Sequence, residues 1–306
     1  DGNEVSSFVL DRIDYNDTRY MNAHIDYRVK QINSIWLQHL SAMPGDYTDI
    51  YNKSKDESVI TLEDREVHKI ILIIQDAAKN TSRIQFNVQY DPSLAKEYKG
   101  NSEIKLNPRE VNVFEESNFE AYTTEFGVYD TVKVSFGNTN NGAKGAVSPL
   151  YHFIGHSIPI HDAVTIRIKP GVFIDPADQA KLVIKNIAGT RTYITKANKS
   201  GNWYTASFRQ FGNYQLFVDN TPPVINNIPT DLSKSTRIAF TPTDNFNTIT
   251  YFRAELDGKW LRFTNNRGKT WLYYFDENFT KGEHELKVVV EDAAGNRTTR
   301  TWKVKR

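Results

Sequence analysis

Three histidines that lie close together in the sequence are the first residues that could bind a metal ion. They are His152, His156 and His161, in the segment SPLYHFIGHSIPIHDA. Histidines four residues apart on one helix can share a zinc ion, because they then lie on the same helix face. Two prolines and a glycine disfavour a helix here, and on an extended strand His152 and His156 would be about 13 Å apart. We therefore expect structural or surface histidines and no metal site.

Other catalytic constellations are missing from the sequence. It contains no cysteine, so it has neither a thiol nucleophile nor a disulfide. It contains no Gly-x-Ser-x-Gly nucleophile elbow, no phosphate-binding glycine loop and no dinucleotide fingerprint. The acidic pair Glu115 and Glu116 lies in a polar stretch, which is typical of solvated carboxylates. We predict no catalytic residue and no cofactor for this chain.

Two similar acidic turns are candidates for calcium binding. The segments DAAKN and DAAGN begin at Asp76 and Asp292 and end at Asn80 and Asn296. Each turn offers only about two side-chain ligands, whereas calcium takes about six to eight oxygen atoms. A structural role is the better interpretation: the aspartate caps the turn, and Gly295 or Asn296 accepts a left-handed conformation.

Three tryptophans could form an aromatic platform for sugars or peptides. They are Trp203, Trp260 and Trp271, and tyrosines neighbour the first and the last of them. In small β-sandwiches such rings more often fill the core, because a large ring replaces aliphatic volume. Alternation along a strand places Trp271 and Tyr273 on one face and Tyr274 on the other. Packing is favoured, and the three tryptophans remain candidates for ligand binding.

The elements that must position these residues are strands. The chain has 306 residues with 39% apolar and 25% charged residues, and it is rich in tyrosine and phenylalanine. Such a composition, with β-branched residues in the periodic stretches, is typical of an all-β soluble protein. The net charge of +1 gives no case for nucleic acid or an anionic membrane as partner. No apolar run is long enough to span a membrane.

A repeated hairpin organises the chain. Residues 68–88 and 284–304 each contain an apolar strand, an acidic turn and a second strand, and His68 corresponds to His284. The tripeptide at residues 1–3 resembles the turn at 257–259, which follows a strand. We expect that the first copy lacks its opening strands, and that an export signal precedes Asp1.

The predicted fold is a series of β-sandwich domains, of which the first and last are immunoglobulin-like. Short strands are expected at residues 5–13, 23–29 and 36–40, and a helical turn at 47–51. Asp219-Asn220-Thr221-Pro222-Pro223 predicts a stiff connector, because proline cannot donate to a strand ladder. The predicted parts are a first module at 1–91, a linker at 92–103, a central sandwich at 104–218, a proline-containing linker at 219–223 and a C-terminal module at 224–306.

Several strings in a fixed order carry a family resemblance. They are LDRI at 10–13, RYMNA at 19–23, DYR at 26–28, SPLY at 148–151, IG at 154–155, PIH at 159–161, VDNTPP at 218–223, DGKW at 257–260 and EDAAGN at 291–296. Together they resemble the C-terminal region of bacterial lysostaphin-like zinc metallopeptidases, in which β-sandwich modules follow the enzyme. The resemblance spans nearly the whole chain.

The resemblance implies an extracytoplasmic protein of the periplasm or cell surface whose full-length form cleaves peptidoglycan crosslinks. The zinc motifs of the family, His-x-x-x-Asp and His-x-His, are absent from this sequence, so no catalytic residue is carried over. Zinc is expected only in a peptidase domain that precedes Asp1, and that domain is the expected partner, with peptidoglycan or an envelope protein as a further one. The alternative is a stand-alone adhesin or glycan-binding protein of the cell surface.

Overall fold

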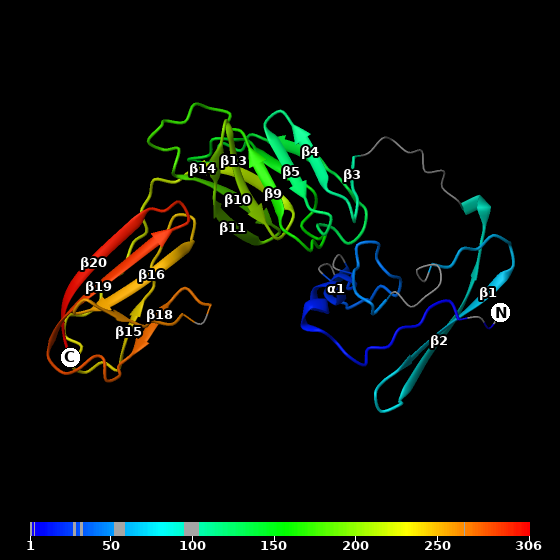
Figure 1. Ribbon diagram of the computed structural model, residues 1–306, viewed down its shortest axis with the longest axis horizontal. Helices are drawn as coiled ribbons and strands as arrows, with labels where there is room; N and C mark the ends of the chain where they lie inside the picture. The colour runs from blue at the N-terminus through cyan, green and yellow to red at the C-terminus, as the bar shows by residue number, and fades with distance from the viewer. Residues whose placement is uncertain are drawn as a thin grey trace. The chain divides into compact units, whose positions relative to one another are not determined.

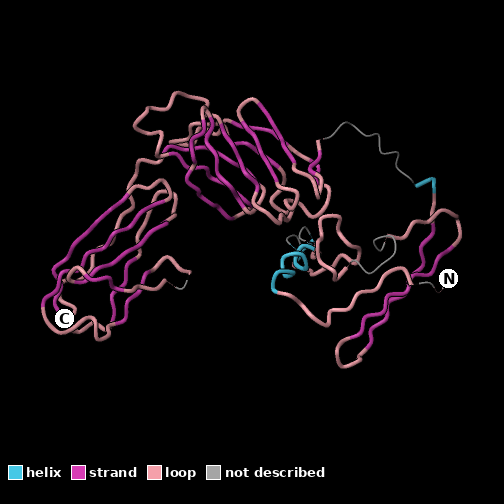
Figure 2. The backbone as a smooth tube through the Cα atoms, viewed as in Figure 1, coloured by secondary structure: helices cyan, strands magenta, loops and turns pink. Residues whose placement is uncertain are grey.

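The computed structural model describes residues 2, 4–26, 29–30, 33–51, 59–94, 104–265 and 267–306. Strands dominate it, which confirms the all-β class (Figure 2). Two compact units make up the chain. The first contains residues 1–110, 125–134 and 157–161, and the second contains residues 111–124, 135–156 and 162–306.

The second unit begins with a central β-sandwich of two five-stranded antiparallel sheets (Figure 1). One sheet has the order β11-β10-β14-β8-β7 and the other the order β12-β13-β9-β5-β4. The strands are β4 (Asn112–Glu116), β5 (Phe119–Thr123), β7 (Phe136–Thr139), β8 (Leu150–Phe153), β9 (Val164–Ile168), β10 (Leu182–Ala188), β11 (Arg191–Lys196), β12 (Asn198–Ser200), β13 (Trp203–Phe208) and β14 (Gly212–Val218).

Aromatic rings fill the space between these two sheets. Phe119 of one sheet lies 5.4 Å from Phe153 and 6.1 Å from Tyr214 of the other, measured between ring centroids. Phe119 and Tyr214 are fully buried. Inward residues alternate with outward ones along β5 and β9, as a half-buried strand requires.

The C-terminal part of the second unit is a smaller sandwich. A four-stranded sheet has the order β17-β16-β19-β20, and β15 pairs with β18. The strands are β15 (Arg237–Phe240), β16 (Ile249–Leu256), β17 (Lys259–Leu261), β18 (Trp271–Tyr274), β19 (Glu283–Asp292) and β20 (Arg297–Lys305). The ring of Phe240 on β15 lies 5.3 Å from that of Trp302 on β20, which joins the two sheets.

The described part of the first unit holds less regular structure. Its elements are η1 (Tyr15–Asp17), α1 (Thr18–Ala23), β1 (Val67–Gln75), β2 (Thr81–Gln89), η3 (Pro92–Leu94), β3 (Lys105–Leu106) and β6 (Val132–Lys133). β1 pairs only with β2 in the sheet that they form, and apolar side chains such as Ile73 and Ile74 are exposed on it.

Several local predictions for the first 91 residues are wrong. Residues 5–13 form no strand, and the segment predicted as a strand from residue 23 instead begins at the end of α1. Residues 36–40 contribute only an isolated bridge between Ile25 and Gln38, and residues 47–51 form bends without a helical turn. Residues 1, 3 and 95–103, which bear on the predicted missing strands and first linker, lie outside the described residues.

Segments 125–134 and 157–161 belong to the first unit, although the sequence boundaries place them in the central sandwich.

A buried pair of side chains lies where the sequence predicts a strand. His24 follows α1, and its Nε2 lies 2.7 Å from Asp46 Oδ2, with both side chains fully buried. The His24 ring stacks on Tyr51, with 3.7 Å between ring centroids. Burial alone would raise the pKa of Asp46, but hydrogen bonds from His24 and Thr48 outweigh it and lower this pKa.

The two predicted hairpin copies have matching register. His68 lies opposite Val88 in the first hairpin, and His284 lies opposite Val304 in the second. β19 pairs additionally with β16, so its inward side chains are buried. Burial of the same hairpin therefore depends on the strand beside it.

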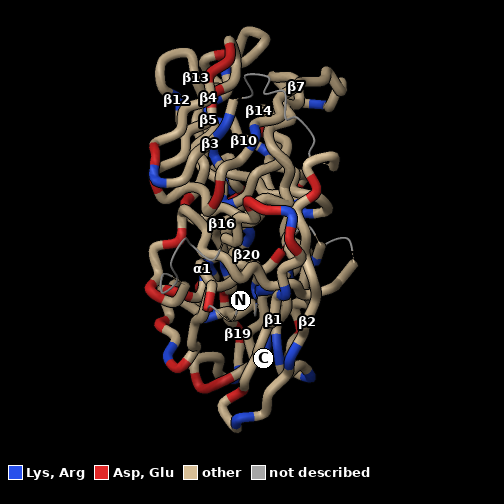
Figure 3. Tube along the Cα trace, turned by 90° about the vertical axis from the view of Figure 1, so that its right-hand side faces the viewer, with Lys and Arg blue, Asp and Glu red and all other residues tan. Residues whose placement is uncertain are grey.

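Charged residues of both signs occur throughout the chain. Lysine and arginine, and aspartate and glutamate, are both distributed over the trace (Figure 3). Within the part of the chain that the structure describes, no helix is long and apolar enough to cross a bilayer.

The buried pair in the first unit yields a stability prediction. Asp46→Ala removes the partner of His24 Nε2, and a buried polar group without a partner costs about 2–4 kcal/mol of the free energy of unfolding. Because the pKa of Asp46 lies below its ordinary value of 3.8 in the folded state, this contribution is present above that pH and is lost as the pH falls through the lowered pKa. Urea denaturation of wild type and variant over a pH series measures both effects.

The matched control is Asp64→Ala. Asp64 forms a similar 2.8 Å contact with His68, but its side chain is 57% exposed. Exposed pairs contribute about 0–1 kcal/mol, so this variant should change stability little. Equal losses in the two variants at neutral pH would contradict a special role of the buried pair.

Candidate functional site

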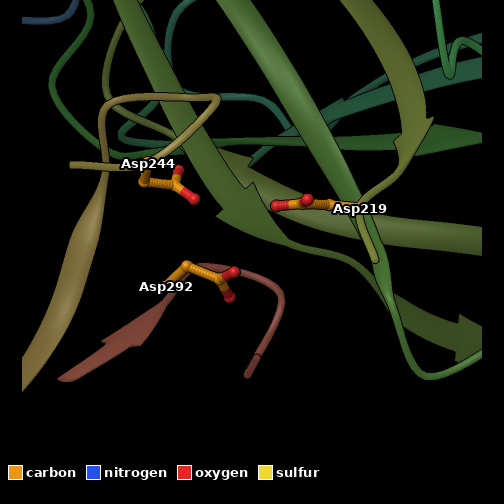
Figure 4. A group of neighbouring side chains, drawn as sticks. All are labelled: Asp219, Asp244 and Asp292. Atoms are coloured by element: carbon orange, nitrogen blue, oxygen red, sulfur yellow. The ribbon is translucent and has the colours of Figure 1, made fainter. Parts of the chain in front are cut away.

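Three aspartates of the second unit converge on one small volume. Asp219 directly follows β14, Asp244 lies in the loop between β15 and β16, and Asp292 ends β19. One carboxylate oxygen from each lies within 4.8 Å of the other two. Figure 4 shows the three carboxylates pointing toward a common space from three separate segments.

Asp219 is held firmly although it begins a predicted linker. Its backbone N–H donates to Lys181 O at 2.9 Å, and its Oδ1 accepts hydrogen bonds from Asn245 Nδ2 and Thr221 N. The residue is 1% exposed, and its Oδ2 is buried without a hydrogen-bond partner. Burial raises the pKa of Asp219, and the charge of Asp292 adds to the increase.

Asp292 is fixed by its own turn. Its Oδ1 accepts from the backbone N–H of Asn296 and its Oδ2 from the Asn296 side-chain amide, both at 2.8 Å. Gly295 allows this geometry because its φ of 81° lies in the left-handed region. The Asn296 amide also donates to Asp219 O at 2.8 Å, so one side chain connects the turn to the linker.

Asp244 completes the cluster from a third direction. Its Oδ2 accepts from the backbone N–H of Phe246 at 2.9 Å, whereas its Oδ1 is buried without a hydrogen-bond partner. Burial raises the pKa of Asp244, and the charges of Asp219 and Asp292 contribute to the increase. Two of the three carboxylates therefore present an unsatisfied oxygen to the cluster.

An apolar contact beside the cluster joins the two sandwiches. Ala293 and Ala294 of the terminal turn pack with Val183 and Phe217 of the central sandwich in one buried group. The ring of Phe246, next to the Asp244 loop, lies 5.3 Å from that of Phe217. We call these five residues, together with the three aspartates and Asn296, the joint.

Two lysines, Lys181 and Lys196, approach Gly295 of the terminal turn beside the cluster. Lys181 Nζ donates to Gly295 O at 3.1 Å, and its charge lowers the pKa of Asp219 by less than burial raises it. Carboxylate oxygens are ligands for hard cations such as calcium or magnesium. The site lacks a thiolate or imidazole, so it does not resemble a zinc centre.

The first copy of the turn shows what the same residues do without the joint. Asn80 N and Nδ2 donate to Asp76 Oδ1 and Oδ2 at 2.9 and 2.8 Å, as in the second copy. Asp76 is exposed, and its hydrogen bonds from Asn80 lower its pKa. Identical local geometry thus gives a solvated aspartate in one copy and a buried acidic cluster in the other.

The histidines that suggested zinc have separate surroundings. His152 Nε2 lies 3.1 Å from Thr139 Oγ1, and His156 lies so close to Gly189 that a Cβ there would be 2.8 Å from its ring nitrogen. His161 stacks on the Tyr20 ring at 4.4 Å. Among the described residues, no group with metal-ligating geometry includes these histidines.

The tryptophans that suggested a platform also lie apart. Trp271 stacks on Phe252 with 4.5 Å between centroids and packs against the C-terminal core. Trp203 lies on the central sandwich beneath the cations of Arg167 and Lys169. Trp260 on β17 is 63% exposed.

Sequence reasoning missed Asp219 and Asp244 because it counted the ligands of each turn separately. In the sequence, Asp219 belongs to the predicted linker, and no motif marks Asp244. The signal that could have found them is topological: the linker, the β15–β16 loop and the β19–β20 turn all lie at one end of the C-terminal sandwich. Three aspartates in loops at the same end are candidates for one site.

The shared amide of Asn296 yields a second prediction. Asn296→Ala removes the side-chain amide that donates to the buried Asp219 carbonyl and to Asp292 Oδ2, which should cost about 1–3 kcal/mol of unfolding free energy. The matched control Asn80→Ala removes the equivalent side-chain bond to Asp76 at an exposed site, where water replaces it, and should cost less than about 1 kcal/mol. Urea denaturation followed by circular dichroism compares the two. Equal costs would show that the link to Asp219 contributes nothing.

Comparisons with known proteins describe the central sandwich best. A family model of the Zu5-like domain matches residues 104–219, a segment that ends on Asp219. A search of curated proteins gives no match. Among solved structures, the extracellular domain of a putative hybrid two-component system from B. thetaiotaomicron is 12% identical, with a TM-score of 0.25 over 76% of this chain. This chain spans 37% of that one.

Proposed function

We propose that this chain is a non-catalytic accessory region of a cell-envelope peptidoglycan peptidase, and that it acts as a structural spacer that positions its partners. The single observation that carries the spacer role is the joint, in which Asp219, the first residue of a predicted linker, is buried and hydrogen-bonded to both sandwiches. The proposal that the parent protein is a peptidase rests on the resemblance to lysostaphin-like peptidases. Catalysis and zinc would belong to a preceding peptidase domain in the periplasm or at the cell surface.

The connector supports this role because it is bound along its length. Asp219 is tied to the central sandwich through Lys181 and to the terminal turn through Asn296. Further along, Pro223 O accepts a hydrogen bond from Thr298, and Arg300 Nη1 donates to Ile225 O at 2.9 Å. Ile225 is 1% exposed. Such a connector fixes the orientation of one sandwich relative to the other, whereas a free linker would limit only the distance between them.

The apolar part of the joint provides the test. Ala294→Glu places a charge where the side chain is fully buried, and a buried charge without a partner is strongly unfavourable. We expect the two sandwiches to separate, with a larger radius of gyration in X-ray scattering and faster protease cleavage at residues 219–223.

The control is Ala78→Glu at the equivalent, exposed position of the first turn. It should leave both measurements unchanged. Circular dichroism establishes that each variant is folded, and the milder Asn296→Ala variant repeats the test if Ala294→Glu unfolds. If a folded Ala294→Glu protein has the same radius of gyration and the same cleavage rate as wild type, the rigid spacer is refuted.

The alternative function, a glycan-binding surface protein, is favoured by the exposure of Trp260. A glycan array and a pull-down on purified peptidoglycan distinguish the two functions. Binding that falls at least tenfold in Trp260→Ala, and not in Trp271→Ala with its packed ring, would support the alternative. No retention above that of a globular control would count against any binding role and leave the spacer role standing.

A further inference from the structure

We propose that Asp219, Asp244 and Asp292 bind a divalent cation of the calcium type, which closes the joint between the two sandwiches. The effect on orientation rests on the proposed spacer function, but the binding itself does not. The three ligands come from the linker, the β15–β16 loop and the β19–β20 turn, so one ion would connect all three segments.

The buried oxygens are the first argument. Acidic side chains often gather on protein surfaces without an ion, because water solvates them. Here Asp219 is 1% exposed, and its Oδ2 and the Oδ1 of Asp244 are buried without a hydrogen-bond partner. Buried polar atoms are nearly always paired, and buried charges are paired or coordinate metals. A cation would satisfy both oxygens at once.

The orientation of the carboxylates is the second argument. Asp219 and Asp244 each use one oxygen for hydrogen bonds from their own neighbourhood and keep the other without a partner, and both carboxylates point toward the cluster (Figure 4). Asp292 is oriented by the two bonds from Asn296 and keeps lone pairs on both oxygens. The ligands are therefore held in place by groups that do not contact the ion, which is how metal sites are usually oriented.

The irregular arrangement of the ligands favours calcium over magnesium. Magnesium demands a near-ideal octahedron at about 2.0–2.1 Å, whereas calcium takes oxygen ligands at about 2.3–2.6 Å in a flexible geometry. The three carboxylate oxygens come from three separate segments and lie within 4.8 Å of one another, which is compatible with oxygens around one calcium ion. Calcium also tolerates irregular coordination, and water would complete its shell of about six to eight oxygens.

Because the three carboxylates repel one another, we predict that the difference in melting temperature between Asp244→Asn and wild type changes sign when calcium is added. A purely structural role of Asp244 would not produce this change. Asp244→Asn removes one of three mutually repelling charges but keeps an oxygen for the Phe246 N–H. In chelator, this variant should therefore melt at a higher temperature than wild type. In calcium, wild type should melt higher than the variant, because only wild type gains the full binding free energy.

The experiment uses the full chain, freed of metal with chelator and titrated with calcium chloride by isothermal calorimetry. We expect one site with submillimolar affinity, an affinity at least tenfold weaker in Asp244→Asn, and no change in the control Asp76→Asn at the exposed turn. Thermal melts in chelator and in calcium complete the comparison.

Three results would overturn the proposal. The first is the absence of binding heat and of a melting shift at about 10 mM calcium, a concentration at which extracellular calcium modules are saturated. The others are equal effects of Asp244→Asn and Asp76→Asn, and binding of magnesium with no binding of calcium. Absence of calcium binding with a joint that stays rigid in scattering would leave the spacer function intact. Calcium binding with a joint that remains flexible would instead refute the spacer and retain the site.

Discussion

Burial of Asp219, the first residue of the connector between two sandwiches, is the constraint on which the second unit depends. A chain that leaves one sandwich through Asp219 and enters the next must satisfy its backbone and carboxylate groups away from water. It does so with a backbone bond to Lys181 and a side-chain bond from Asn296. Since the Asn296 amide reaches both Asp219 and Asp292, the position of the linker and the conformation of the terminal turn are decided together.

The two copies of the acidic turn have the same local geometry but different tertiary surroundings. Asp76 and Asp292 cap their turns with the same hydrogen bonds at nearly the same distances. Sequence and local structure are thus equivalent, yet the pKa of Asp76 is lowered in solvent while Asp292 lies among two carboxylates whose pKa values are raised. The difference arises from what packs against the turn. Alanines that are exposed in the first copy form the apolar half of the joint in the second.

The proposed spacer role and the proposed cation have a common physical basis. Apolar packing of Phe217 and Phe246 holds the sandwiches together without direction, whereas ligands from three segments define an orientation. An oriented spacer is what the proposed accessory role requires, because it would hold a proposed peptidase domain at a polymeric substrate. The match to a Zu5-like domain covers the central sandwich and reaches the first of the three aspartates.

What the sequence determined was local: the all-β class, the hairpin repeat with its register, and the capped turns at Asp76 and Asp292. These depend on alternation and on bonds between residues four apart, which the linear sequence contains. The tertiary structure alone decided the helix before His24, because its buried partner Asp46 lies 22 residues away. It also decided the acidic cluster, since Asp219 and Asp292 are separated by a whole sandwich in sequence. Convergence of side chains from distant loops follows from how the sheets pack, and no local pattern encodes that packing.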